Sequence, residues 1–368
     1  MGFSKQDTKC IKALAVMLML YHHLFAFADR LPESGFSSFF SIGGQEAATY
    51  VGAFGKICVA LFLFLGGYGT YLSYSKKTDG DRAMLGRVGH LYVEYWKVFA
   101  VFVPICLLVG APGVRAEGLT FFKNLFAIRI SYNGEWWFFT PYVVLLLLYP
   151  LIHRVAKRRF GLCVELVAIC CLAALLSTVF PWIMAREWAS GFVQTTFWGC
   201  VKRVPEILPA FLMGCLFAKY DLLSRIKALC ADRYWTVAPA AAAVCVVFYL
   251  WLKMGSARGC ELDFVFAPVF TAAMAVILNF KGVALVKAPL AFIGGKSTGI
   301  WLIHSFWCYK LTPKLIYAPR YSLFIFLWLL AISLGCAVLL DLAWKYVGRG
   351  VRYLLKKAEK KQNGMGIS

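Results

Sequence analysis

Long apolar runs alternate with short polar segments along almost the whole chain. A helix needs about 20 consecutive apolar residues to cross a bilayer, and the runs are close to that length. The pattern therefore predicts an all-α fold, a polytopic transmembrane helical bundle with about ten spans. The expected spans are residues 7–27, 50–74, 91–109, 136–152, 162–184, 204–218, 235–254, 264–280, 290–309 and 321–346.

Basic residues are distributed unevenly between these runs. They gather after the second run, after the fourth in the stretch HRVAKRRF, after the sixth and behind the tenth. The positive-inside rule assigns such clusters to the cytoplasm, which also puts both termini there. We expect residues 1–350 to form one transmembrane domain. Residues 351–368 would form a basic cytoplasmic tail, either free in solvent or bound to anionic lipid headgroups.

Composition supports a membrane protein and excludes several other classes. The chain has 368 residues, of which 61% are hydrophobic and 15% charged, whereas soluble domains have about a quarter charged residues. The net charge of +21 does not indicate nucleic-acid binding, because the basic residues flank apolar runs instead of covering a soluble face. None of the thirteen cysteines has a CxxC spacing, so neither a disulfide framework nor a metal site is expected.

The first run contains the strongest candidates for chemistry. His23 follows Lys12 by eleven residues, close to three helical turns, so both lie on one face about 16 Å apart. Ionisable groups inside a membrane are rare and tend to be functional, and histidine suits a general base because its pKa lies near neutral pH. The alternative is a packing histidine. His22 points about 100° away and is expected to support or pack.

Further candidates flank the later runs. Glu135, Trp136 and Trp137 open the fourth run, where aromatic faces beside an acid suit a sugar but also suit an interfacial belt. Glu206 lies inside an apolar run and needs a partner. Arg203, three residues earlier, is the closest cation on the same helix face, and their pairing is either functional or only structural.

A second deep histidine, His304, follows Ser297 by two turns on one face of the ninth run. A serine nucleophile would need a base and an acid, and no acid is near in sequence. We therefore favour His23 as a base that acts directly. Ser297 is expected to contact the acceptor or to support the site, and His304 to support the site or to contribute to donor binding.

Several stretches together resemble the acyltransferase-3 family of membrane-bound O-acyltransferases. The family's first span has an arginine, ten residues and a histidine, to which Lys12 and His23 are similar. Four further stretches resemble the family's: FLFLGGYGTYL, GEWWFFTPYVVLLLLYP, RVPEILPAFLMG and GGKSTGIWLIH. A paired-arginine motif corresponds to Arg87 and His90. Lys12 keeps the charge but lacks the bidentate fork of arginine, Gly66 stands where serine is commoner, and His90 replaces an arginine.

The resemblance implies transfer of an acyl group, in the main expectation an acetyl group. It would pass from cytoplasmic acetyl-CoA, as acyl-CoA co-substrate, to a hydroxyl of an extracytoplasmic glycan or polysaccharide, with His23 as the general base. The phosphates of CoA need cations, and Lys12, Arg82, Arg87 and His90 lie near the expected inner surface. For Arg82 and Arg87 the alternative is a plain topology residue.

The same resemblance implies the plasma (inner) membrane of a bacterium as the location. The expected partners are acyl-CoA, the glycan acceptor, the lipid bilayer and, where transfer is indirect, a separate extracytoplasmic protein that passes the acyl group on.

The main alternative is a transporter or exporter of a polar metabolite or glycan, because deep histidines also form proton-coupled pathways. Internal sequence repeats would favour a transporter, and no such repeat is evident in this chain. A glycan polymerase or ligase would favour large outer loops, and the loops here are short.

Overall fold

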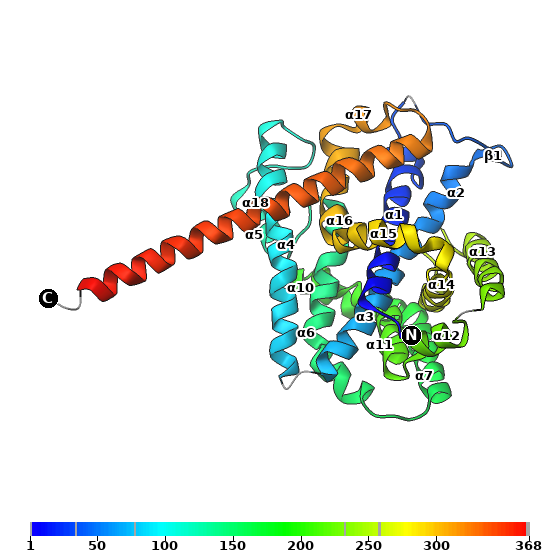
Figure 1. The fold of residues 1–368 in the computed structure, drawn as a ribbon. Coiled ribbons are helices and arrows are strands. Elements are labelled where there is room, and N and C mark those ends of the chain that lie inside the picture. The colour runs from blue at the N-terminus through cyan, green and yellow to red at the C-terminus, as the bar shows by residue number, and fades with distance from the viewer. Residues whose placement is uncertain (1, 34, 77–78, 232, 257–258, 366–368) are drawn as a thin grey trace.

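The computed structural model describes residues 2–33, 35–76, 79–231, 233–256 and 259–365 (Figure 1). The described chain is a helical bundle with one two-stranded antiparallel hairpin, β1 (Ser41–Ile42) and β2 (Gln45–Glu46). The longer helices are α1 (Lys5–Phe25), α3 (Cys58–Ser75), α4 (Gly80–Leu108), α6 (Phe139–Ala156), α7 (Leu162–Ala174), α11 (Val204–Lys219), α13 (Val237–Met254), α14 (Asp263–Ile277), α15 (Ala284–Gly295) and α18 (Ser322–Met365).

Shorter helices connect these elements. The short α-helices are α2 (Ala47–Phe54), α5 (Gly118–Leu125), α8 (Phe180–Met184), α9 (Ser190–Val193), α10 (Thr196–Val201), α12 (Leu222–Leu229), α16 (Ser297–Ser305) and α17 (Pro313–Tyr317). The single turns that bear on the site are η1 (Ala28–Arg30), η2 (Gly55–Ile57), η3 (Gly134–Phe138) and the π-helical turn η8 (Phe306–Leu311).

The described part of the chain contains six helices that are long and apolar enough to cross a membrane. Two bent helix pairs raise this number to eight if each pair is one span, with bends of 61° and 91°. The helical membrane fold is therefore confirmed, while ten spans and cytoplasmic termini stay predictions. The six helical stretches are Ala47–Ser75, Gly80–Leu108, Gly134–Ala156, Leu162–Met184, Tyr234–Met254 and Ser322–Gly350.

Helix α1 lies inside the bundle and packs against α2, α3, α15 and α16. Its N-terminus is fixed by a capping box, in which the Ser4 hydroxyl accepts from the backbone N–H of Asp7 and the Asp7 carboxylate accepts from the backbone N–H of Ser4. The same carboxylate pairs with Lys227 of α12 at 2.7 Å. These contacts hold α1 in a fixed position along its axis.

Glycines allow the backbones of two pairs of helices to touch. A Cβ on Gly67 of α3 would overlap the carbonyl oxygen of Phe211 on α11, and a Cβ on Gly214 of α11 would overlap that of Phe64. Gly294 of α15 meets Lys9 of α1 in the same way. Small residues at such contacts are typical of helix packing in membranes, where close van der Waals contact drives association.

Two predicted spans have different boundaries in the structure. The third run was expected to begin at residue 91, but α4 begins at Gly80 because Asp79 caps it and accepts from the N–H of Arg82 at 3.0 Å. The ninth run was expected to be one helix over 290–309. It is divided instead, because Gly294 and Gly295 end α15 and a new helix begins at Ser297.

Helix α18 continues past residue 350 to Met365 without a break. Its C-terminal part extends away from the other helices (Figure 1). The expected tail is therefore helical in the part that the structure describes.

Candidate functional site

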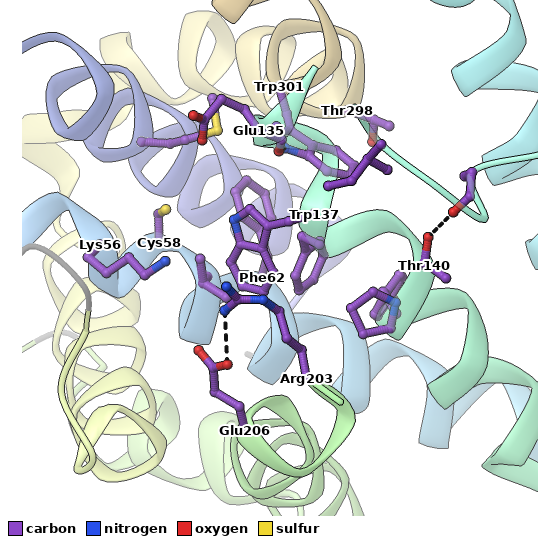
Figure 2. Close-up of a pocket in the computed structure, with 18 of the residues that line it drawn as sticks. Lys56, Cys58, Phe62, Glu135, Trp137, Thr140, Arg203, Glu206, Thr298 and Trp301 are labelled. Carbon is purple, nitrogen blue, oxygen red and sulfur yellow. Dashed lines mark hydrogen bonds and ion pairs between the residues drawn. The ribbon is translucent and has the colours of Figure 1, made fainter. Parts of the chain in front are cut away.

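A cavity of about 1000 Å³ lies beside α1 and is lined by α3, α6, α11, α16 and the turns η2 and η3 (Figure 2). It gathers most of the residues that the sequence singled out from separate parts of the chain. Those that line it are Lys12, His22, His23, Glu135, Trp137, Arg203, Glu206 and Ser297. The cavity is therefore the candidate active site.

His23 occupies the last turn of α1, and its side chain is 10% exposed. Its Nδ1 lies 3.4 Å from Glu135 Oε2 and 3.4 Å from the hydroxyl of Tyr309, which donates to the backbone carbonyl of His23. Because a carboxylate can only accept a hydrogen bond, we assign the proton of the neutral His23 imidazole to Nδ1. Nε2 then keeps the lone pair that a general base needs.

Glu135 is held by a second charged partner. Arg30, from η1, donates to Glu135 Oε1 at 2.8 Å and lies over the rings of Phe27 and Tyr309. Burial alone would lower the pKa of Arg30. Hydrogen bonds from the guanidinium to Tyr309 and Glu135 outweigh burial and raise this pKa above its ordinary value. One carboxylate thus connects a permanent cation to the imidazole.

Indole hydrogen bonds fix the turn that carries Glu135. Trp301 of α16 donates to the backbone carbonyl of Glu135 at 3.2 Å, and Trp136 donates to that of Leu302 at 3.0 Å. Trp136 is fully buried, so it anchors η3 against α16 and does not face lipid as a residue of an interfacial belt would. Its role here is to position its neighbours.

His304 lies directly behind His23. The two ring centroids are 4.7 Å apart, and His304 Nδ1 contacts the carbonyl of Trp301 at 2.7 Å. Within the described ranges its Nε2 has no hydrogen-bond partner, and the residue is fully buried. His304 therefore packs against the His23 ring and does not itself line the cavity.

His22 also lines the cavity, and its ring contacts the His23 ring edge to face, with the two ring centroids 5.1 Å apart. Its Nδ1 lies 3.0 Å from the carbonyl oxygen of Gly52 in α2. Ser297, at the start of α16, is nearly buried in the wall.

The cavity lining also contains two cations beside the ring of Trp137. Arg203 lies 4.6 Å from the centre of the Trp137 ring, and the Lys56 Nζ lies 4.7 Å from it. Arg203 pairs with Glu206 at 3.1 Å, which confirms the expected partner (Figure 2). Figure 2 shows this pair below Trp137, with Glu135 and Trp301 above it.

Three of the four predicted phosphate ligands do not line this cavity; Lys12 does. Arg82 is exposed on α4. Arg87 donates to the Thr70 hydroxyl at 2.6 Å, to Ser73 at 2.8 Å and to the Gly69 carbonyl, and so ties α4 to α3.

His90 lines a separate cavity of about 210 Å³. That cavity contains a network in which Lys97 pairs with Glu94 at 2.6 Å and with Asp341 at 3.0 Å, while Lys296 pairs with Asp341 at 2.6 Å. Thr298 borders both cavities.

The sequence reasoning missed several residues of the site. Arg30, Lys56 and Tyr309 lie in short turns, and nothing in their local pattern distinguishes them from loop or interfacial residues. They become recognisable only when the fold brings them to His23 and Trp137. Across the described ranges, no group of three or more His, Cys, Asp or Glu is placed to hold a metal ion.

Comparison with known proteins identifies the family of the chain. The model of an acyltransferase domain, that of the acyltransferase-3 family, matches residues 8–342, nearly the whole chain. No curated protein and no solved structure matches the chain. Because the family match spans the first helix, the cavity and almost all of the apolar helices, the chain belongs to the acyltransferase-3 family and is a membrane acyltransferase.

Proposed function

We propose that the protein is an O-acetyltransferase that moves an acetyl group from acetyl-CoA to a hydroxyl of an extracytoplasmic glycan or polysaccharide. The observation that carries the proposal is the position of His23, held by Glu135 and Tyr309 at the wall of a large cavity that Lys12 also lines. An alcohol is a poor nucleophile unless its proton is removed as it attacks. A histidine that has one nitrogen fixed, and no hydrogen-bond partner for the other among the described residues, suits that task.

In the proposed reaction, His23 Nε2 takes the proton of the acceptor hydroxyl while the oxygen attacks the thioester carbonyl. A new C–O bond forms and the C–S bond breaks. The imidazolium then returns the proton to the leaving thiolate, which gives free CoA. Glu135 stabilises the imidazolium as it forms, because the carboxylate faces Nδ1 at 3.4 Å.

The two substrates would enter from opposite ends of the cavity. Lys12 lies three turns before His23 on α1, where it can meet a phosphate of acetyl-CoA entering from the cytoplasm. Trp137 lines the cavity near Glu135 and presents an aromatic face to a sugar. In this arrangement the inner membrane of a bacterium would separate donor from acceptor.

The test is release of free CoA from acetyl-CoA by protein purified in detergent, measured by chromatography and mass spectrometry with and without a crude surface-glycan acceptor. We expect His23→Ala to lower acceptor-dependent release at least about a hundredfold, as expected for loss of a general base. The matched control is His153→Ala, because His153 of α6 does not line the cavity. It should release CoA like the wild type.

If His23→Ala keeps most of the activity, His23 is not the base. If the wild type neither binds acetyl-CoA nor releases CoA, the transport of a polar metabolite or glycan becomes the better reading of the same cavity.

A further inference from the structure

Positive charge dominates the lining of the large cavity. The only acids that line it among the described residues, Glu135 and Glu206, each pair with one arginine. Lys12, Lys56, Arg129 and Lys202 also line the cavity and have no carboxylate within ion-pair distance in the described part of the chain. The cavity therefore has a surplus of cations that the protein itself does not neutralise.

These unpaired cations fall into two groups. Lys12 is alone, three turns before His23 on α1. Lys56 contacts the Trp137 ring on the other side of the cavity. Arg129 and Lys202 lie on two neighbouring loop segments, which contact each other where the Cys200 thiol meets the carbonyl of Ile128 at 3.8 Å.

Arg129 and Lys202 are unusual because they are basic residues in segments that are expected to lie outside the cell. By the positive-inside rule, lysine and arginine are disfavoured in outer loops, yet Arg129 and Lys202 come from segments predicted to be outside. Like charges around one cavity repel one another and attract an anion. Topology alone does not account for cations that converge on a substrate cavity.

We propose that this end of the cavity binds an acidic acceptor, a sugar that carries a carboxylate or phosphate group close to the hydroxyl that is acylated. Trp137 would pack against the sugar ring, and Lys56, Arg129 and Lys202 would hold the acidic group. This inference rests on the proposed function and narrows its acceptor from glycans in general to anionic ones. The phosphates of CoA are the other source of the same chemistry, and the experiment separates the two.

The test is calorimetric binding of two probes, methyl glucuronide and methyl glucoside, to detergent-purified protein saturated with CoA. We expect the glucuronide to bind at least about tenfold more tightly at low salt, a difference of about 1.4 kcal/mol. The double variant R129E/K202E should abolish this preference and leave acetyl-CoA affinity unchanged. Both side chains are exposed and neither donates a side-chain hydrogen bond within the described ranges, so the variant should fold.

The matched control is Arg115→Glu, which makes the same change of charge at an exposed loop residue that does not line the cavity. It should keep the preference for the acidic probe. If the two probes bind equally, or neither binds, while acetyl-CoA is still bound and turned over, the acidic acceptor is rejected and the acyltransferase proposal stands. If the double variant instead loses affinity for acetyl-CoA, the cations serve the donor and the inference is wrong. Failure of the wild type to bind acetyl-CoA would count against the proposed function itself.

Discussion

At the scale of single residues, the site is organised by one carboxylate that faces both an arginine and a histidine. Glu135 contacts Arg30 at 2.8 Å and His23 at 3.4 Å, so its charge keeps the imidazole oriented and stabilises it when protonated. Arg30 limits the motion of the carboxylate. In the proposed mechanism, the activity of His23 as a base would therefore depend on a neighbour that does not itself take up the proton.

This dependence predicts the effect of Glu135→Gln. The amide cannot stabilise an imidazolium as a carboxylate does, so we expect kcat to fall by about 10²- to 10³-fold while the KM for acetyl-CoA changes little. Glu135→Asp should recover part of the loss because it restores the charge.

The control for that series is Glu117→Gln, an exposed residue whose carboxylate contacts only Thr120 in the described structure. A fall in donor affinity with unchanged kcat in Glu135→Gln would show that the carboxylate serves binding instead of proton transfer.

The sequence predicted only the parts of the site that follow helical spacing or stand out by residue type. The helix period places Lys12 and His23 on one face, and both line the cavity. Glu135 was noticeable as an acid at the start of an apolar run. Arg30 and Tyr309 were not predictable, because their contacts with Glu135 and His23 join residues 105 and 286 positions apart.

At the scale of elements, hydropathy located the apolar helices well and their ends less well. Only the apolar part of a helix contributes to the pattern, so the polar first turns of α4, which carry Arg82, Arg87 and His90, were read as a loop. The break after Gly295 was missed for a related reason. Glycine is apolar enough to continue a run even where it ends a helix.

The glycine contact between α3 and α11 makes a prediction at this scale. Gly67→Ala would force a Cβ into the backbone of Phe211, and overpacking of this kind costs about 1–3 kcal/mol. We expect a lower melting temperature in detergent, followed by tryptophan fluorescence, together with reduced activity. Gly69→Ala is the control, because a Cβ there meets nothing within 4 Å. Equal melting temperatures for the two variants would show that the helices can separate at no cost.

At the scale of the whole molecule, reporter fusions measure the orientation of the bundle in the membrane. The basic clusters predict both termini in the cytoplasm. A fluorescent protein fused after Ser368 should therefore fluoresce in a bacterial host, while alkaline phosphatase at the same position should stay inactive. Phosphatase fused within the loop at Arg115 should be active. The reverse pattern would invert the bundle and exchange the donor and acceptor ends of the cavity.

Sequence reasoning gave the class of this fold but not its cavity. Apolar runs identify helices whichever way they pack, and they do not show the bends of 61° and 91° between α11 and α12 and between α14 and α15. The cavity is lined in part by η2 and η3, which have no hydropathy signal of their own. The unpaired cations around it could be named from the sequence, but only the fold shows that they converge.

The contact between Tyr309 and His23 has a consequence for biosynthesis. The ribosome makes α1 first, and the tyrosine that covers the backbone of His23 follows 286 residues later. A nascent chain that has not reached η8 carries His22, His23 and every described residue that lines the large cavity, but lacks the tyrosine hydroxyl that holds the backbone of His23. The contact that fixes the end of α1 therefore forms only when the bundle is nearly complete.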